Sequence, residues 1–203
     1  MMKIVDYGLG NIRAFLAAYK KLGIPISTAS TPAELAGSTR IILPGVGSFD
    51  NAMARLEESG LRESLNRLVL VENVPVLGVC VGMQMLAQRS EEGLLGGLGW
   101  IAGEVKKFSS VAGGRLRRVP HMGWNEARLV RPNKLFDGLA GARFYFLHSF
   151  YLECHKDSDI LAVTDYDGDF VCGISSGNVF GVQFHPEKSH QWGSHLLENF
   201  ANL

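Results

Sequence analysis

The segment VPVLGVCVGMQ, residues 74 to 84, carries an apolar run directly into a cysteine that stands between two glycines. The run is rich in valine and leucine and has Pro75 near its start, which is typical of a buried strand. The residues after Cys80 have the pattern of a helix that begins there. A strand that turns at once into a helix is the repeating unit of a parallel sheet, so this segment predicts an α/β fold.

The first half of the chain repeats this alternation of strand and helix. MKIVDY (2–7) and RIILPG (40–45) are apolar runs of strand length. Apolar residues with helical spacing follow at 11–22, 49–60 and 61–73. Continuous apolar strands separated by helices indicate a mostly parallel sheet with helices on both faces.

The second half has a different texture. Beyond about residue 100, short runs such as RFYFLHSFYLE, ILAVTDYDG, FVCGISSG and NVFGVQFHPE alternate with turns of glycine and aspartate. They predict an antiparallel extension of the sheet, closed by a final helix at 193–203. The chain has no repeat and no obvious linker, and its length suits one core, so we expect a single domain over residues 1–203.

Composition and charge exclude several classes of protein. The 20 basic and 20 acidic side chains cancel, so no excess of positive charge points to nucleic acid. No apolar run approaches the roughly 18 residues of a membrane helix, and the N-terminus has the pattern of a first strand rather than of a signal peptide. The three cysteines form no CxxC pair, which argues against disulfides and metal binding. We therefore expect a cytoplasmic protein without a metal and without a membrane or nucleic-acid partner.

The segment GLGN, residues 8 to 11, follows the first strand and opens a helix, as a dinucleotide-binding fingerprint does. The third glycine of that fingerprint would fall on Arg13, and no acidic residue ends a second strand about 20 residues later. The segment therefore predicts a tight turn, and we expect no bound cofactor.

Gly78, Cys80 and Gly82 reproduce the nucleophile-elbow pattern G-x-S-x-G, with cysteine in the place of serine. The central residue of an elbow has a strained backbone, and its glycine neighbours have no room for side chains. The thiol would stand at the carboxyl end of the sheet and at the positive end of the following helix, which favours the reactive thiolate. The alternative is an inert buried cysteine, because free cysteines are often buried.

A partner for this cysteine occurs near the end of the chain, in FHPEKS at 184–189. Pro186 holds His185 extended, so the side chains of His185 and Glu187 should project to the same side. A carboxylate there can orient an imidazole and stabilise its cation, as the third member of a catalytic triad does. Alone, His185 would be read as a surface residue and Glu187 as a solvated charge. Together with Cys80 they predict a nucleophile, its base and an orienting group.

These motifs resemble those of the class I glutamine amidotransferases, whose cysteine attacks the side-chain amide of glutamine. The resemblance covers essentially the whole chain. Further motifs are similar to one branch of the class, the glutaminase subunits of imidazole glycerol phosphate synthase; they are DYGLGN (6–11), PGVGSF (44–49), VPHMGWN (119–125) and HSFY (148–151). Phe150 departs slightly from the HSY pattern that is usual there.

The resemblance implies a flavodoxin-like sheet and hydrolysis of L-glutamine through a cysteinyl thioester. Cys80 would attack the carboxamide, His185 would carry the proton and Glu187 would hold His185. Backbone N–H groups of Val81 and Gly47 would bind the oxyanion. The residues at positions where the family binds glutamine are Gly45, Gln84, Glu92 and Ser149. The alternatives are that Gln84 is an ordinary helix residue and that Glu92 is a solvated charge.

The resemblance also implies a partner that uses the ammonia. In this family the partner is a separate (β/α)₈-barrel cyclase, which forms a heterodimer with the glutaminase in L-histidine biosynthesis. The residues expected to face the barrel are Asn11, Pro120, Met122, Trp124 and Lys188. Trp124 suits an exposed anchor, although its residue type fits a buried core position equally well.

Other functions remain open at this stage. One is a glutaminase for a different synthase or a γ-glutamyl hydrolase of the same superfamily, and another is a binding module that has lost the chemistry. An intact set of Cys80, His185 and Glu187 argues against the binding module. His121 and His148 have no carboxylate spaced to orient them, so we expect a structural or glutamine-proximal role for both.

Overall fold

The computed structural model describes residues 1–112, 115–116 and 118–203. Neighbouring parallel strands in the order β2-β1-β3-β4-β15 form one half of the main sheet. Their bounds are Met2–Val5 for β1, Ile26–Ala29 for β2, Arg40–Gly45 for β3, Val76–Cys80 for β4 and Val179–Val182 for β15. This is the strand order of a flavodoxin-like sheet, so the predicted fold class is confirmed.

Mostly antiparallel strands extend the sheet beyond β15, as predicted, in the order β14-β12-β6-β5 with β13 and β10 as a branch. Their bounds are Asp169–Ser176 (β14), Phe150–Cys154 (β12), Gly103–Lys107 (β6), Arg89–Ser90 (β5), Ile160–Asp165 (β13) and Arg128–Leu129 (β10). The sequence pattern predicts that β15 belongs to this antiparallel extension. In the structure β15 pairs antiparallel with β14 on one side and parallel with β4 on the other. It is buried throughout, because it lies where the two halves of the sheet meet.

In the described part of the chain, two antiparallel pairs of strands lie outside the main sheet. β9 (His121–Glu126) pairs with β11 (Arg143–His148), and β7 (Val111–Ala112) pairs with β8 (Arg115–Leu116). The β9–β11 pair matters for the site, because β11 leads directly into β12 at the edge where the parallel strands end.

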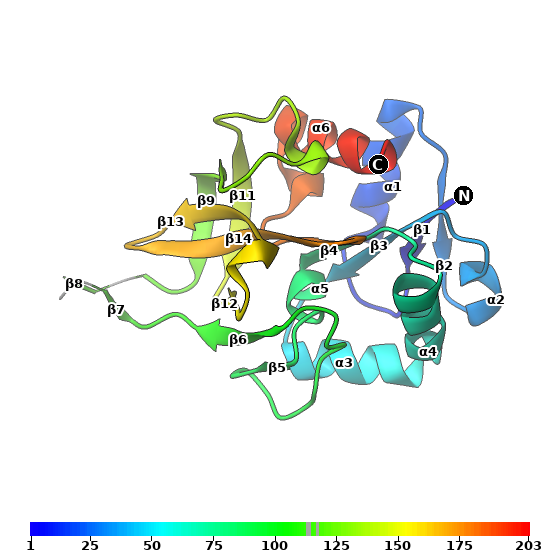
Figure 1. Cartoon of the computed structure of the whole chain (residues 1–203), viewed down its shortest axis with the longest axis horizontal. Helices are drawn as coiled ribbons and strands as arrows, with labels where there is room; N and C mark the ends of the chain where they lie inside the picture. Colours follow the sequence, from blue (N-terminus) through cyan, green and yellow to red (C-terminus); the bar gives the residue numbers. More distant parts are fainter. Residues whose placement is uncertain (113–114, 117) are drawn as a thin grey trace.

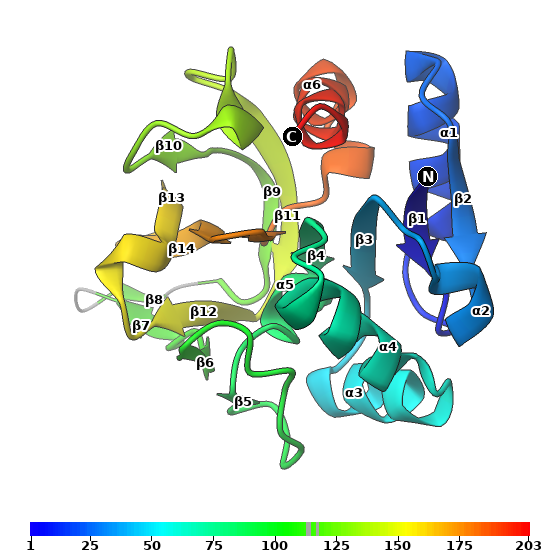
Figure 2. The ribbon, with the colours of Figure 1, turned by 45° about the vertical axis from the view of Figure 1, so that its right-hand side comes forward.

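Helices cover both faces of the parallel half (Figures 1 and 2). α1 and α6 lie together on one face, and α3 and α4 lie on the other. The bounds are Ile12–Leu22 (α1), Pro32–Leu35 (α2), Phe49–Glu58 (α3), Leu61–Asn66 (α4), Val81–Gln84 (α5) and His190–Ala201 (α6). Short 3₁₀ turns occur at Lys134–Phe136, Asp157–Asp159 and Pro186–Lys188. None of the helices in the described ranges is long and apolar enough to cross a membrane.

The final helix begins three residues earlier than predicted, and two other helices differ more from the predictions. The helix after Cys80 is a single turn, because the carbonyls of Met85 and Leu86 accept hydrogen bonds from Leu98 and Ile101 (2.7 and 2.9 Å) instead of continuing the helix. The helix predicted over 61–73 changes from α-helical to a π-helical segment at Arg67–Val71. The short α5 provides one turn of N–H groups beside Cys80 and little of the predicted macrodipole.

A close contact between backbones fixes the turn that follows β4. A Cβ atom on Gly82 would lie 2.0 Å from the carbonyl oxygen of Leu43 on β3, and one on Gly45 would lie 2.4 Å from the nitrogen of Gly82. A Cβ atom on Gly78 would lie 2.7 Å from the Gly82 carbonyl oxygen. Gly78 and Gly82 therefore lie where two backbone segments are in contact. This confirms the prediction that the glycines of the elbow have no room for side chains.

We predict that Gly82→Ala lowers the free energy of unfolding by about 3 kcal/mol or more, or prevents folding, because neither backbone can move away without breaking the sheet. Gly96→Ala is the matched control, since its nearest neighbour would be the Gln88 carbonyl oxygen at 3.8 Å. Urea denaturation of the two variants measures the difference. Equal stability of both variants would show that the contact at Gly82 does not constrain the fold.

Candidate active site

Cys80 stands at the end of β4 with a backbone conformation that residues other than glycine rarely adopt. Its φ is 56° and its ψ is −115°, which costs on the order of 1–3 kcal/mol. The fold holds it there because β4 must turn into α5 within one residue while Gly82 packs on β3. The strained elbow predicted from the sequence is therefore present, and it directs Cys80 into a cleft.

His185 and Glu187 form the expected pair. The 3₁₀ turn that begins at Pro186 brings the Oε1 atom of Glu187 to 2.9 Å from the Nδ1 atom of His185. The Nδ2 group of Asn11, from the start of α1, donates to the same oxygen at 2.7 Å. The backbone of His185 is fixed as well, since its N–H donates to the Tyr145 carbonyl at 2.9 Å. Glu187 thus sits behind His185, away from the cleft.

The surroundings of His185 favour its cation. Burial alone would lower its pKa, but hydrogen bonds and charge interactions with Cys80 and Glu187 outweigh that effect and raise the pKa to about 10. A cationic imidazole beside a thiol favours a thiolate–imidazolium pair. Burial, and to a smaller extent the nearby Cys80, raises the pKa of the Tyr7 hydroxyl, so this group remains neutral. It donates a hydrogen bond to the Pro44 carbonyl at 2.7 Å.

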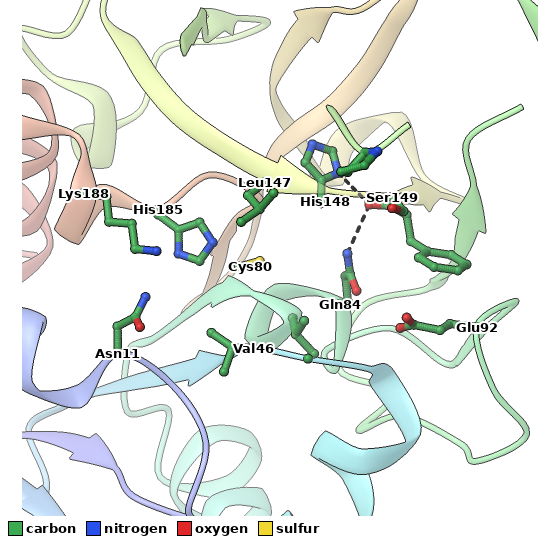
Figure 3. Close-up of a pocket in the computed structure, with 14 residues that line it drawn as sticks. Asn11, Val46, Cys80, Gln84, Glu92, Leu147, His148, Ser149, His185 and Lys188 are labelled. Carbon is green, nitrogen blue, oxygen red and sulfur yellow. Dashed lines mark hydrogen bonds between the residues drawn. The ribbon is translucent and has the colours of Figure 1, made fainter. Parts of the chain in front are cut away.

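The cleft has a volume of about 470 Å³ and is partly open. Figure 3 shows the side chains that line it. Cys80 lies between Asn11 and Lys188 at one end and Glu92 at the other. The residues expected from the sequence that line it are Asn11, Gly47, Cys80, Val81, Gln84, Glu92, Pro120, Ser149, His185 and Lys188. The fold therefore brings together residues that lie as far apart in the sequence as Asn11 and Lys188.

Three residues expected to bind glutamine have further contacts that explain their positions. Gln84 is buried and donates to the Phe150 carbonyl at 3.1 Å, so it is not an ordinary helix residue. Glu92 accepts from the N–H of Phe49 at 2.8 Å and so caps the start of α3, which excludes a merely solvated charge. Gly45 does not line the cleft; it packs against the backbone of Gly82, so its position here is explained by packing.

His121 and His148 form a buried pair, and His148 also lines the cleft, so their expected structural or glutamine-proximal role stays a prediction. The Nδ1 atom of His121 lies 3.0 Å from the Nε2 atom of His148. Burial lowers the pKa of His121 to about 4 and that of His148 to about 3, so both rings are neutral near pH 7. Among the described residues, no group of His, Cys, Asp and Glu side chains could hold a metal ion.

The residues expected at a partner interface lie on the surface. Met122 is 65% exposed and Trp124 is 39% exposed, on alternate positions of β9. Trp124 stacks on His190 with ring centroids 5.2 Å apart, so it is not a buried core residue. Asn11 and Lys188 end the cleft on the other side of Cys80 from Glu92.

Gln183 is a site residue that the sequence reading missed. Its side chain is completely buried, and its Nε2 atom lies 3.8 Å from the Sγ atom of Cys80. The sequence offered one signal for this residue, which is the amide side chain of Gln183 within the apolar run NVFGVQF. A buried amide needs hydrogen-bond partners, so such a residue is expected to have a specific contact.

The model of the family Glutamine amidotransferase class-I matches residues 3–203. The chain belongs to this family. Its relatives include proteins named imidazole glycerol phosphate synthase subunit HisH from Bdellovibrio bacteriovorus and Leptospira interrogans, which are 57% and 52% identical over 100% of both chains. A HisH 2 protein of Methanococcus maripaludis is 44% identical over 98% of each chain.

Solved structures agree with the fold of this glutamine amidotransferase. A crystal structure described as a glutamine amidotransferase has a TM-score of 0.75 at 20% identity and covers 100% of this chain and 99% of its own. A structure of PurLQS from Thermotoga maritima also has a TM-score of 0.75 at 20% identity, and the match covers 99% of this chain and 97% of that one. At these identities the likeness supports the shared fold.

We predict that a glutamine analogue with an electrophilic carbon in place of the carboxamide labels Cys80 ahead of Cys154 and Cys172. Burial raises the pKa of the other two thiols to about 12, so they stay protonated and unreactive near pH 7. Peptide mass spectrometry at increasing reaction times measures the order, with Cys80→Ala as the control. Glutaminase activity should fall in step with modification of Cys80. Full activity after complete labelling of Cys80 would contradict its assignment as nucleophile.

Proposed function

We propose that this glutamine amidotransferase is the glutaminase subunit of an imidazole glycerol phosphate synthase and supplies ammonia for L-histidine biosynthesis. The names of its full-length relatives, at 44–57% identity, support this choice among the synthases of the class. The observation that carries the chemistry is the strained Cys80, which lines the same cleft as His185, the imidazole that Glu187 orients from behind. Because these residues are intact, we set aside the binding module that has lost its chemistry.

The reaction begins when the Sγ atom of Cys80 attacks the carboxamide carbon of L-glutamine. His185 holds the proton of the thiol and gives it to the leaving nitrogen, so ammonia departs and a thioester remains. Water then attacks the thioester and transfers a proton through His185, which releases L-glutamate and restores the thiol. Glu187 keeps the imidazole in place and stabilises its cation in both steps.

The negative oxygen of each tetrahedral intermediate needs hydrogen-bond donors. We assign this role to the backbone N–H groups of Val81 and Gly47, which both line the cleft beside Cys80. Gly47 has a φ of 86° in the loop after β3, a conformation suited to glycine. Loss of one such donor typically costs a factor on the order of 100 to 1,000 in rate. Gln84, Glu92 and Ser149 bind the substrate from the other walls of the cleft.

The ammonia requires an acceptor enzyme. We propose a heterodimer with a separate (β/α)₈-barrel cyclase, docked over Met122, Trp124 and the open edge of the cleft at Asn11, Pro120 and Lys188. An exposed tryptophan beside an exposed methionine is a typical interface anchor. The cysteines are free thiols, as is usual in the reducing cytoplasm, where we place the reaction.

We predict that Cys80→Ala abolishes product formation from glutamine by the pair of subunits and leaves product formation from added ammonium largely intact. The reason is that Cys80 acts only in releasing ammonia, whereas the chemistry on the second substrate belongs to the cyclase. The measurement is product formed from glutamine and from ammonium in parallel, with Cys154→Ala as the matched control. Loss of both reactions in an assembled complex would contradict the proposal. Glutamine hydrolysis that no cyclase stimulates or channels would instead favour a γ-glutamyl hydrolase.

A further inference from the structure

A chain of hydrogen bonds between buried side chains ends at the sulfur of Cys80. Gln183 follows β15 and lies two residues before His185. Its Oε1 atom accepts from the Nε2 group of Gln84 at 3.0 Å, and its own Nε2 group lies 3.8 Å from the Sγ atom of Cys80. Gln84 and Gln183 are both buried, so solvent does not provide alternative partners.

The carbonyl of Phe150 determines which group donates and which accepts in each hydrogen bond of this chain. Figure 3 shows Gln84 and His148 converging on the same oxygen, which is the carbonyl of Phe150 at 3.1 and 2.7 Å. A carbonyl oxygen only accepts, so the Gln84 atom that faces it must be the NH₂ group. The second N–H of that group then donates to Gln183, whose facing atom must be the oxygen. The NH₂ group of Gln183 is therefore directed at the sulfur.

The same carbonyl also orients the histidine pair. The Nδ1 atom of His148 must carry a hydrogen to donate to Phe150, so its Nε2 atom accepts from His121 at 3.0 Å. Burial keeps both rings neutral, which preserves this direction. The carbonyl of Phe150 thus has fixed donors on both sides, and Gln84 cannot reverse its amide without placing oxygen against oxygen.

We propose that Gln183 is a catalytic residue, which donates an N–H to the Sγ atom of Cys80 and stabilises the thiolate before attack and again as the thioester breaks. A donor binds an anion more strongly than a neutral thiol, so the contact gains strength when the proton moves to His185. Gln183 lies on the same short segment as His185, so one stretch of backbone positions both the donor to the sulfur and the imidazole that lines the cleft with Cys80.

A packing role alone does not explain this side chain. Gln183 continues a buried apolar strand, where leucine or methionine would fill the space without needing hydrogen bonds. Its backbone is already held by the bond from its N–H to the Cys172 carbonyl at 2.9 Å. The amide is needed for what it contacts, and these partners are Gln84 and the nucleophile.

The proposal rests on Cys80 being the nucleophile of the proposed function. The test measures the rate at which iodoacetamide alkylates Cys80 across a range of pH, in the full chain and in Gln183→Met, by peptide mass spectrometry. We expect the midpoint of the rate-against-pH curve to move up by about one pH unit in the variant, because the thiolate has lost a donor. Gln88→Met is the matched control, since Gln88 is exposed, and its midpoint should not move.

Kinetics with the cyclase present separate this role from a structural one. We expect Gln183→Met to lower kcat for glutamine hydrolysis about 10- to 100-fold with a small change in KM, while synthesis from ammonium is unchanged. Gln183→Leu carries the test if the methionine variant does not fold. Its side chain is apolar, so it cannot donate to sulfur and adds no charge beside it, and the midpoint should again rise.

Unchanged midpoints and an unchanged kcat in both Gln183 variants would overturn the proposal. A fall in thermal stability or a rise in KM without a shift of the midpoint would also overturn it, because that is the signature of packing alone. If Cys80 in the unaltered chain is no more reactive than Cys154, the proposed nucleophile itself has failed, and this outcome is distinct from the other two.

Discussion

The contact between Gly82 and the carbonyl of Leu43 is the constraint on which the site depends. It joins the first turn of α5 to β3 at the distance where only backbone fits, and Cys80 must then take a positive φ between β4 and α5. Because β3, β4 and β15 are adjacent and parallel, their carboxyl ends deliver the Gly47 loop, Cys80 and His185 to one edge. The strained cysteine that we propose as nucleophile, the histidine that we propose as its base and a glycine loop are therefore brought together by one arrangement of strands.

Two sets of hydrogen bonds hold the side chains of the site, one from each side of Cys80, and they differ in the groups that they use. On one side, Asn11 donates a hydrogen bond to Glu187, which in turn contacts His185, so the start of α1 supports the proposed triad. On the other side, the carbonyl of Phe150 fixes a row of neutral amides that ends at the sulfur. Under our proposals, the cation of His185 and the neutral donor Gln183 provide the preorganisation that lowers the cost of forming a thiolate at Cys80.

Features set by local pattern could be predicted from the sequence, and features set by contacts between distant segments could not. The parallel strands, the elbow at Cys80 and the pairing of His185 with Glu187 are visible because each is encoded within a few residues. The length of α5 depends on a later segment that takes its carbonyls, and β15 is parallel only because it returns beside β4. Gln183 was missed for the same reason, since its partners lie far away in the chain.

The roles assigned to residues of the cleft remain predictions, and one property decides most of them. If the sulfur is a thiolate held by a cation, His185 must stay protonated far above the ordinary pKa of a histidine. Its neighbours Cys80 and Glu187 raise that pKa to about 10, so the proton should be lost only as the pH rises through this value. The other steps of the proposed mechanism depend on the positive charge of His185.

The most direct measurement is an NMR titration of the imidazole nitrogens in ¹⁵N-histidine-labelled protein, with the His185 signal assigned by its loss in His185→Gln. We predict that His185 remains an imidazolium through neutral pH and titrates near pH 10, and that Cys80→Ala moves the titration to lower pH. A His185 that titrates near its ordinary value of 6.5, unaffected by Cys80→Ala, would contradict the thiolate–imidazolium pair.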